Sequence, residues 1–536
     1  MSLRNRLVVP VIFSALALLV GCGGSSTNSV TPPPSGGFSN TNFNGTYTFS
    51  FTGGDANGVF AIAGSLVACG CSAGTISSGS LDFVDPTGVD PASAIGSNST
   101  YHINADGRGT ARLMYTPTGG TASEIDVDFV LSSSSHGMIM EYDSNGGGSG
   151  TIDQQPAAVA QTSLAATPYA FSLSGSDNSN NTLLSVGALT LDSGGNIQTG
   201  AVQDFNYSAT PTTQLTLTGT VTVGSGTTPG TAQLSTSFGN FTFDVYAIDS
   251  SHLKLIENDG QAILVGDAFA QTSTSFPTGT LVFQVAGLDT SSNLMTAAGL
   301  MSSSGAAIPS GTEDINDDGT IDNGTNPATP FNFTGFDTSS GGGRYLLTLS
   351  NFAGASLFAA YPSSGGLLLM QVDTGLAAGT MSGIALTQTS TTGLAASQGY
   401  AMGLSGEDTV GVAQLDEIAE FKTIGTGLSG LIDNDESLAT SNLNGSYTTG
   451  SNGTGSVTFT SQQELFYYGV DDSTTLFITA DSSEAAMGAL QLQTTPTNAA
   501  FAVAKSPRAL PTPRPMVRKR SSSPSRRGGH QINTFE

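Results

Sequence analysis

The segment whose residue types most clearly suggest chemistry is DINDDGTIDNGT, from Asp314 to Thr325. Acidic and amide side chains alternate along it, and Gly319 occupies the sixth position, as in a calcium-binding loop. The candidate calcium ligands are Asp314, Asn316, Asp318, Thr320 and Asp322. The twelfth position holds Thr325 instead of the usual bidentate glutamate, so the segment fits a plain Asp/Asn/Gly turn as well. Both interpretations stay open, and the sequence suggests no other cofactor.

A second pair of candidates is Cys69 and Cys71, which form Cys-Gly-Cys in a predicted hairpin. Two cysteines cannot supply the four ligands of a structural zinc site by themselves. An oxidising compartment favours a disulfide between them, although so small a loop would be strained and two free thiols are the alternative. Neither interpretation gives the pair a catalytic role.

Histidine, the most common general base, is scarce in this chain. His136 and His252 occupy matching places in repeated segments, five residues before Glu141 and Glu257 respectively. On a strand, an odd offset points two side chains to opposite faces, so each histidine is a poor partner for its glutamate. We interpret both histidines as polar residues bordering a turn.

Familiar catalytic motifs are missing from the sequence. It contains no Gly-x-Ser-x-Gly elbow, no His-Glu-x-x-His zinc motif and no phosphate-binding Gly-x-x-x-x-Gly-Lys-Ser/Thr loop. We therefore assign no catalytic residue and expect a non-enzymatic protein. Glycosidases need only two suitably spaced carboxylates, so a secreted carbohydrate-active hydrolase or carbohydrate-binding protein is the alternative. That alternative would bring strand-end carboxylates together in one cleft. The carboxylates whose positions decide between the two hypotheses are Asp82, Asp204, Asp314 and Asp433.

Internal repetition is the feature that must position these residues. Four segments open alike: YTFSFTGGD from Tyr47, YAFSLSGSD from Tyr169, LVFQVAGLD from Leu281 and YAMGLSGED from Tyr400. In each, apolar residues alternate with small or polar ones, which places them on one face of a strand. Each repeat also ends on a short predicted strand that closes in glutamine, at Gln155, Gln271, Gln388 and Gln493.

Short alternating runs separated by Gly, Asn, Asp and Ser predict an all-β chain of four tandem antiparallel meanders of roughly 110 residues each. The repeats are 43–155, 164–271, 278–388 and 397–493, and are called repeats 1 to 4 below. We expect about eight strands per repeat, closed into a small β-barrel or folded as a β-sandwich. Each repeat is long enough to fold alone, so we expect independent beads on a string.

The amino-terminal residues predict export and a lipid anchor. Arg4 and Arg6 precede a 14-residue apolar run, Leu7 to Val20, which is too short for a comfortable membrane span and suits a signal peptide over residues 1–21. The tetrapeptide ending in Cys22 resembles the lipobox of bacterial lipoproteins. In that family the cysteine sulfur carries a diacylglycerol and the new amino terminus is usually acylated, which implies a cell-envelope protein bound to membrane lipid. The residue after the cysteine favours the outer membrane or cell surface.

Outside the repeats, 22–42 reads as a flexible tether and 505–536 as a disordered basic tail. Between Cys22 and Ala504 there are five basic and 40 acidic residues, so this part of the chain repels nucleic acid. The tail holds eight of the 15 basic residues and is read either as a surface-binding extension or as a shifted reading frame.

The repeat layout resembles that of tandem-repeat lipoproteins of soil bacteria, on the segments FNGTYTFSFTGGD, SSHLKLIEND and LNGSYTTG. The likeness covers most of residues 43–493. It implies a surface location and a repeat architecture, and it implies nothing about chemistry. We expect tandem β-domains that serve as a surface spacer, an adhesive or a ligand-binding array, with an unknown surface ligand or glycan as partner.

Overall fold

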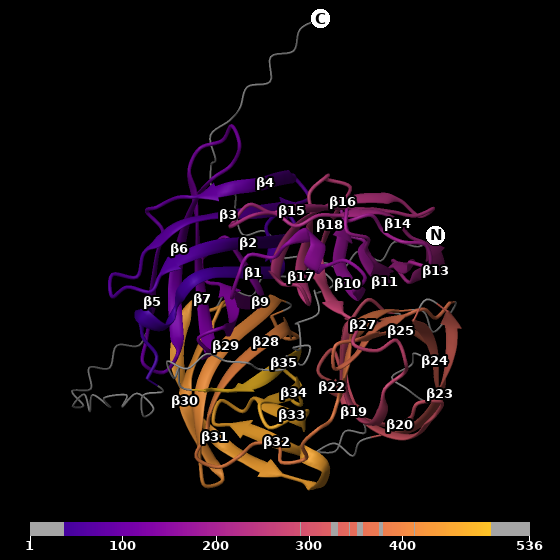
Figure 1. Ribbon diagram of the computed structural model, residues 1–536. Helices are drawn as coiled ribbons and strands as arrows, with labels where there is room; N and C mark the ends of the chain where they lie inside the picture. The colour runs from indigo at the N-terminus through magenta and orange to yellow at the C-terminus, as the bar shows by residue number, and fades with distance from the viewer. Residues whose placement is uncertain are drawn as a thin grey trace, which may run out of the picture. The chain divides into compact units, whose positions relative to one another are not determined.

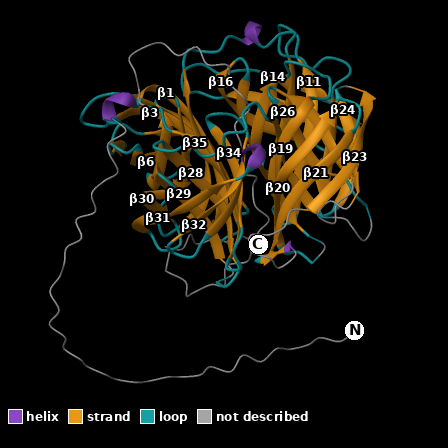
Figure 2. Ribbon diagram, turned by 90° about the horizontal axis from the view of Figure 1, so that it is seen from below, coloured by secondary structure: helices purple, strands orange, loops and turns teal. Residues whose placement is uncertain are grey.

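The computed structural model describes residues 37–494 except for positions 290, 323–330, 342, 351–356, 375–378 and 412. Within these residues the fold is all-β, with four sheets and short 3-10 turns (Figures 1 and 2). The turns are η1 (Asn40–Asn42), η2 (Gln161–Ser163) and η5 (Ser451–Gly453). None of the described helices has the length and apolar character needed to cross a bilayer. The signal peptide, Cys22 and the basic tail lie outside the described residues.

Each repeat supplies one sheet. Repeat 1 contains β1 (Asn44–Asp55), β2 (Val59–Cys69), β3 (Ile76–Asp85), β4 (Gly88–Ile95), β5 (Thr100–Ile103), β6 (Arg108–Thr116), β7 (Ser123–Ser133), β8 (His136–Glu141) and β9 (Gly146–Gln155). Repeat 2 contains β10 (Pro168–Asp177), β11 (Thr182–Thr190), β12 (Val202–Tyr207), β13 (Thr210–Thr216), β14 (Thr218–Val221), β15 (Gly230–Ser235), β16 (Asn240–Asp249), β17 (His252–Glu257) and β18 (Ala262–Ala270).

The last two repeats follow the same plan. Repeat 3 contains β19 (Thr278–Leu288), β20 (Leu294–Ser304), β21 (Ile308–Asp317), β22 (Thr320–Ile321), β23 (Phe331–Gly341), β24 (Arg344–Ser350), β25 (Leu357–Ser363), β26 (Gly366–Gln371) and β27 (Thr380–Thr387). Repeat 4 contains β28 (Gly399–Asp408), β29 (Ala413–Ile424), β30 (Gly427–Asn434), β31 (Ala439–Thr449), β32 (Thr454–Phe459), β33 (Glu464–Gly469), β34 (Thr474–Thr479) and β35 (Glu484–Leu492).

Within a repeat, most strands that are neighbours in sequence pair antiparallel, and the first strand of each repeat also pairs with the last. The exceptions are β4 with β5, β13 with β14 and β22 with β23, which do not pair with each other. In repeat 4 this closes an eight-stranded barrel, β28 to β35. In repeats 1 and 3 the pairings β4–β6 and β20–β21 close the sheet in the same way. The sheet of repeat 2 runs from β13 to β14 without such a ladder. The all-β meander prediction is confirmed, and the closing pairings of repeats 1, 3 and 4 decide for barrels over sandwiches in those repeats.

The alternating apolar residues that open each repeat fill the barrel interior. In β1, Tyr47, Phe49 and Phe51 are buried in one cluster with Phe129, other residues of repeat 1 and the preceding Phe38. Repeats 2, 3 and 4 each have a corresponding cluster of their own. Because strand alternation sends every second side chain inward, the repeated openings account for four separate cores.

Repeat 1 has nine strands, one more than the eight located in the sequence. The missed strand is β4, whose sequence GVDPASAI contains Pro91 and few apolar residues. It pairs with β3 on one side and meets β6 only through its last two residues, Ala94 and Ile95. Proline is tolerated where a ladder hydrogen bond is not required, so this weakly paired strand gives almost no sequence signal.

The outer faces of the barrels pack together, so the expectation of independent beads was wrong. One buried cluster contains residues from all four repeats, among them Met138, Val186, Ile384 and Ile418. A smaller cluster joins Ala61 and its neighbours in repeat 1 to residues of repeat 2. All described residues belong to one compact unit. These strands are apolar on both faces, because one face lines a barrel and the other contacts a neighbouring barrel.

Candidate functional site: the polar junctions between repeats

The four strand-end carboxylates lie in four different places, each between two repeats. We call these contacts junctions 1/2, 2/3, 3/4 and 4/1. The carboxylates occupy the same register in their barrels: Asp82 pairs with Ala63, Asp204 with Val186, Asp314 with Ala298 and Asp433 with Ile418. All four are buried, with side chains on the outer face of the sheet. They therefore meet neighbouring repeats rather than one another.

In three junctions a tyrosine of the next repeat donates a hydrogen bond to this aspartate. Tyr246 Oη lies 2.5 Å from Asp82 Oδ2, and Tyr361 Oη lies 2.5 Å from Asp204 Oδ2. Tyr468 makes the same contact with Asp314.

Strand register shows that these three tyrosines occupy the same position in their repeats, each opposite the same position of the following strand. Their cross-strand partners are Lys254 for Tyr246, Leu368 for Tyr361 and Leu476 for Tyr468. Burial raises the pKa of Asp314 to about 6, while the hydrogen bond from Tyr468 lowers it. In junction 2/3 the buried Arg344 also donates from Nε to Asp204 Oδ2, at 2.6 Å.

Junction 4/1 uses a different donor. In repeat 1 the equivalent of the tyrosine is Val130, and its cross-strand neighbour Arg108 reaches Asp433 instead. Arg108 Nη1 lies 3.0 Å from both carboxylate oxygens of Asp433, and its Nε lies 3.3 Å from Asp106. The first and last repeats are thus joined by an ion pair without the tyrosine hydrogen bond that the other three junctions have.

The glutamines that close the repeats form a second set of equivalent contacts. Each donates its side-chain amide to the backbone carbonyl that follows the tyrosine position of the next repeat. The pairs are Gln155 to Ala247 at 2.6 Å, Gln271 to Pro362 at 2.7 Å, Gln388 to Gly469 at 2.8 Å and Gln493 to Leu131 at 3.0 Å. The fourth pair joins repeat 4 back to repeat 1, so the junction contacts form a closed cycle of four.

Junction 1/2 also contains a buried network of charged groups. Lys254 is fully buried, and its Nζ donates to Thr151 Oγ1 at 2.7 Å and to Ser50 Oγ at 3.2 Å, both in repeat 1. Its Nζ also lies 3.4 Å from Asp267 and 3.8 Å from Asp153. Burying an ammonium is costly unless it is paired and hydrogen-bonded, and this network meets both conditions.

The two histidines complete the network. His136 Nδ1 lies 2.8 Å from Asp153, and His252 Nε2 lies 2.5 Å from Asp267. Burial alone would raise the pKa of Asp267, but Lys254 and His252 hold it below its ordinary value. Both histidines begin strands after a turn, as expected, but the sequence did not indicate that each is paired with an aspartate of its own repeat.

Glu141 and Glu257 end β8 and β17 and are buried. In both, Oε2 has no hydrogen-bond partner. Burial, together with nearby carboxylates such as Asp143, raises the pKa of Glu141 to about 8. Burial and Asp259 raise that of Glu257 to about 9. These glutamates are therefore protonated near neutral pH and do not act there as ionised nucleophiles or bases.

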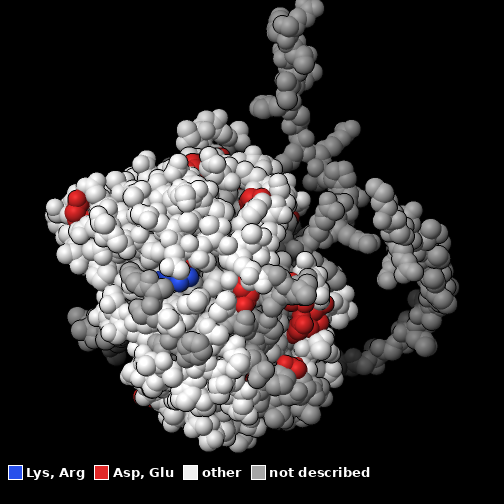
Figure 3. Space-filling model, turned by 90° about the vertical axis from the view of Figure 1, so that its right-hand side faces the viewer, with Lys and Arg blue, Asp and Glu red and all other residues white. Residues whose placement is uncertain are grey.

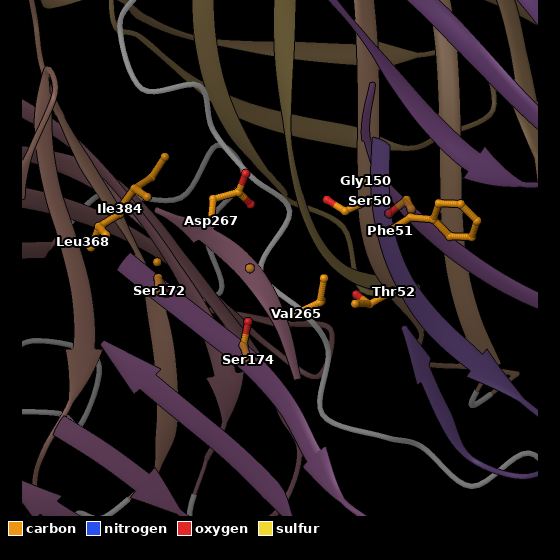
Figure 4. Close-up of a pocket in the computed structure, with 13 residues that line it drawn as sticks. Ser50, Phe51, Thr52, Gly150, Ser172, Ser174, Val265, Asp267, Leu368 and Ile384 are labelled. Atoms are coloured by element: carbon orange, nitrogen blue, oxygen red, sulfur yellow. The ribbon is translucent and has the colours of Figure 1, made fainter. Parts of the chain in front are cut away.

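A small cavity lies where repeats 1, 2 and 3 meet (Figure 4). Its lining includes Ser50, Thr52, Ser174 and Asp267, with Leu368 and others from repeat 3, and its volume is about 50 Å³. That volume suits a few water molecules and is far below the roughly 300–1,000 Å³ of a typical small-molecule pocket. We therefore do not assign a substrate to it.

The segment proposed for calcium contributes to junction 3/4. Asp314 and Asn316 lie on β21, and the hairpin to β22 turns at Asp318 and Gly319, which both have positive φ. Asn316 Nδ2 donates to Thr479 O at 2.9 Å and to other carbonyls of repeat 4. Thr320 is on β22, Asp322 follows it, and Thr325 is outside the described residues. Across the described residues, no group of three or more His, Cys, Asp or Glu side chains is arranged to hold a metal ion. Calcium binding stays a prediction.

Cys69 and Cys71 form a disulfide in the structure, with Cα atoms 5.2 Å apart, at the end of β2. On the face shown in Figure 3, acidic side chains are scattered over a mostly uncharged surface. Three of the five basic residues of the repeats, Arg108, Lys254 and Arg344, are in junctions and largely buried. Nineteen acidic residues of the described part of the chain are buried as well, so the excess of acidic over basic groups at the surface is smaller than the sequence count.

Comparison with known proteins gave structural likeness only. No protein-family model matches the chain, and no curated protein matches it. Among solved structures, a transferrin binding protein B mutant from Haemophilus parasuis Hp5 is 10% identical, with 69% of this chain and 86% of that chain covered and a TM-score of 0.18. The isotype 1 transferrin binding protein B of serogroup B Neisseria meningitidis is 10% identical, with 66% and 82% covered and a TM-score of 0.20. Intact Ap-TbpB, with N and C lobes, is 8% identical, with 89% and 98% covered and a TM-score of 0.19. At these TM-scores the likeness supports no conclusion about what this chain binds.

Proposed function

We propose that this chain is a non-enzymatic cell-envelope lipoprotein, lipidated at Cys22, whose four barrels form one body that acts as a surface spacer, an adhesive or a ligand-binding array. The proposal rests mainly on where the polar side chains at equivalent positions of the repeats make their hydrogen bonds. The four equivalent aspartates and the four closing glutamines are engaged in contacts between repeats, and each barrel interior is filled by its own apolar cluster. Such a molecule offers its outer surface as the functional part.

The hydrolase alternative required strand-end carboxylates to converge. Asp82, Asp204, Asp314 and Asp433 instead lie in four different junctions, and each has a hydrogen-bond donor from the next repeat. A glycosidase pair needs two carboxyl groups within about 10 Å of each other on either side of a substrate site. No observation favours this alternative over the surface array.

Lipidation is tested by metabolic labelling with a palmitate analogue in the native host. The wild-type chain and a Cys71→Ser control should be labelled and recovered with outer membranes, because the predicted acceptor is Cys22. A Cys22→Ala chain should be unlabelled and released. Equal labelling of the Cys22→Ala chain would contradict the anchor.

The surface role is tested on intact cells. A deletion strain and its complemented parent are compared for adhesion and for binding to a glycan array, and purified protein is incubated with a panel of polysaccharides. Loss of adhesion or glycan binding without release of reducing sugars supports the proposal. Catalytic release of sugars that is abolished by Asp→Asn substitution at one junction would overturn it.

A further inference from the structure

The two junctions that flank repeat 1 share a feature that the other two junctions lack. In each, a second carboxyl group faces the junction aspartate from the neighbouring barrel. Asp244 lies two residues before Tyr246 and is hydrogen-bonded to Asp82. Asp128 lies two residues before Val130 in the same register, and it faces Asp433. The equivalent positions in repeats 3 and 4 are the apolar Ala359 and Phe466.

All four carboxyl groups are removed from water. Asp82 is 0% exposed, Asp433 3%, Asp244 5% and Asp128 6%. Two ionised carboxylates that face each other in such a place repel strongly, so one member of each pair binds a proton. At junction 1/2 burial and then the Asp244 charge raise the pKa of Asp82 to about 8. At junction 4/1 burial and then Asp433 raise the pKa of Asp128 to about 7, against the opposing effect of Arg108.

The groups around the first pair are mostly neutral. Tyr246 Oη and the backbone N–H of Ala92 donate to Asp82, and Asn258 Nδ2 donates to Asp244 at 2.7 Å. None of these donors carries a positive charge. The second carboxylate charge at this junction therefore has no cation among these contacts to offset it.

The second pair is surrounded by one cation and several acids. Arg108 bridges Asp433 and Asp106. Glu420 on β29 is 3% exposed, and burial and then Asp106 raise its pKa to about 8. Two further titratable neighbours are Asp126, on the same strand as Asp128, and Tyr142. Burial, and then the charges of Asp128 and Asp433, raise the pKa of Tyr142. One arginine cannot balance all these carboxylates when they are ionised.

We propose that repeat 1 is held in the four-repeat body by carboxyl groups that share protons across its two junctions, and that both junctions loosen as the pH rises. The closed junctions bind protons that the separated, solvated carboxyls release. Their contribution to stability is therefore complete below the ordinary carboxyl pKa of about 4 and is lost progressively as the pH rises through about 8. Each proton released on opening raises the opening equilibrium constant roughly tenfold per pH unit in that window.

The position of repeat 1 in the chain links this pH dependence to the proposed function. Repeat 1 follows the predicted tether at 22–42, so the proton-dependent contacts separate the anchored repeat from the other three. Repeats 2, 3 and 4 keep their own junctions, where tyrosine hydrogen bonds face apolar neighbours. Alkaline surroundings would then free the outer repeats from repeat 1 without unfolding any barrel.

The test uses the full chain, its Asp128→Asn/Asp244→Asn variant and a matched Glu124→Gln control. The new amide at position 244 can donate to an ionised Asp82, and the change at position 128 removes the charge that faces Asp433. Glu124 lies on the same strand as Asp128 but is exposed and lies 3.9 Å from the exposed Arg112. Infrared spectra near about pH 6 should show a stronger band of protonated carboxyl groups in the wild type than in the double variant, and this difference should disappear by about pH 9. Glu141 and Glu257 contribute equally to both spectra, so they cancel in the difference.

Small-angle scattering over the same range gives a second readout. The wild type and the Glu124→Gln control should expand with rising pH, while far-ultraviolet circular dichroism stays constant. The double variant should stay compact. A wild type without a protonated carboxyl band, or a double variant that expands as much as the wild type, would overturn the proposal.

Discussion

Replacing Arg344 by methionine should be among the most damaging single changes in the chain. Arg344 is 1% exposed and donates to Asp204, which is 0% exposed. Methionine fills much of the same space but leaves the carboxylate without its cation. Removing one partner of a buried ion pair typically destabilises a protein by about 3–5 kcal/mol, because the remaining charge is buried and uncompensated.

The remaining donors place the expected loss near the lower end of that range. Asp204 keeps hydrogen bonds from Tyr361 Oη and from the backbone N–H of Gln214, at 2.5 and 2.6 Å. We therefore expect a loss of about 3 kcal/mol, or somewhat more than a hundredfold in the folding equilibrium.

The assay is urea unfolding followed by circular dichroism at neutral pH. Arg112→Met is the matched control, because Arg112 pairs with Asp126 on the surface and its loss should leave the transition unchanged. The double variant Arg344→Met/Asp204→Asn should recover part of the loss, because it removes the uncompensated charge. A single variant as stable as the wild type would refute the assignment of Arg344 to a buried junction.

Four further predictions follow from the same contacts. Tyr468→Phe removes the donor to buried Asp314 and should lower the free energy of unfolding by about 1–3 kcal/mol, measured by urea titration, with a rise in the pKa of Asp314. Gln388→Ala removes hydrogen bonds to Gly469 O and Asn452 O and should destabilise by about 1–2 kcal/mol in the same assay. Because the pKa of Asp267 is held low, its contribution is present above about pH 4 and lost in acid; Asp267→Asn should lower the melting temperature at neutral pH and flatten its decline in acid. If the predicted calcium site exists, calcium raises the melting temperature of the wild type but not of Asp318→Asn/Asp322→Asn; identical responses would exclude it.

The parts of the fold that sequence reasoning predicted are those encoded locally. Period-two alternation at Tyr47, Phe49 and Phe51 marks a strand face, and four copies of that pattern mark four sheets, each with its own core. Strand β4 was missed because Pro91 and exposed residues remove the alternation on which the prediction depended.

The junctions could not be predicted because they join residues far apart in the chain. The closing glutamines were visible as a repeated feature, but their acceptors lie 81 to 362 positions away. The tyrosines at 246, 361 and 468 are equivalent only after strand register is known, and Val130 interrupts the series in repeat 1. A single sequence shows hydrophobic periodicity and turn residues, but it does not show which repeats pack against each other or through which outer faces.

The cycle of junctions is tested most directly by a disulfide between repeats 4 and 1. Thr494 N lies 2.8 Å from Ser132 O, and the equivalent contact in junction 3/4 joins Thr389 N to Val470 O at 2.7 Å. In a Cys69→Ser/Cys71→Ser background, Ser132→Cys/Thr494→Cys should oxidise within one chain as readily as the control pair Val470→Cys/Thr389→Cys. Mass spectrometry of monomeric protein identifies the linked peptides. A control pair that forms while the pair between repeats 4 and 1 stays reduced would contradict the closed cycle.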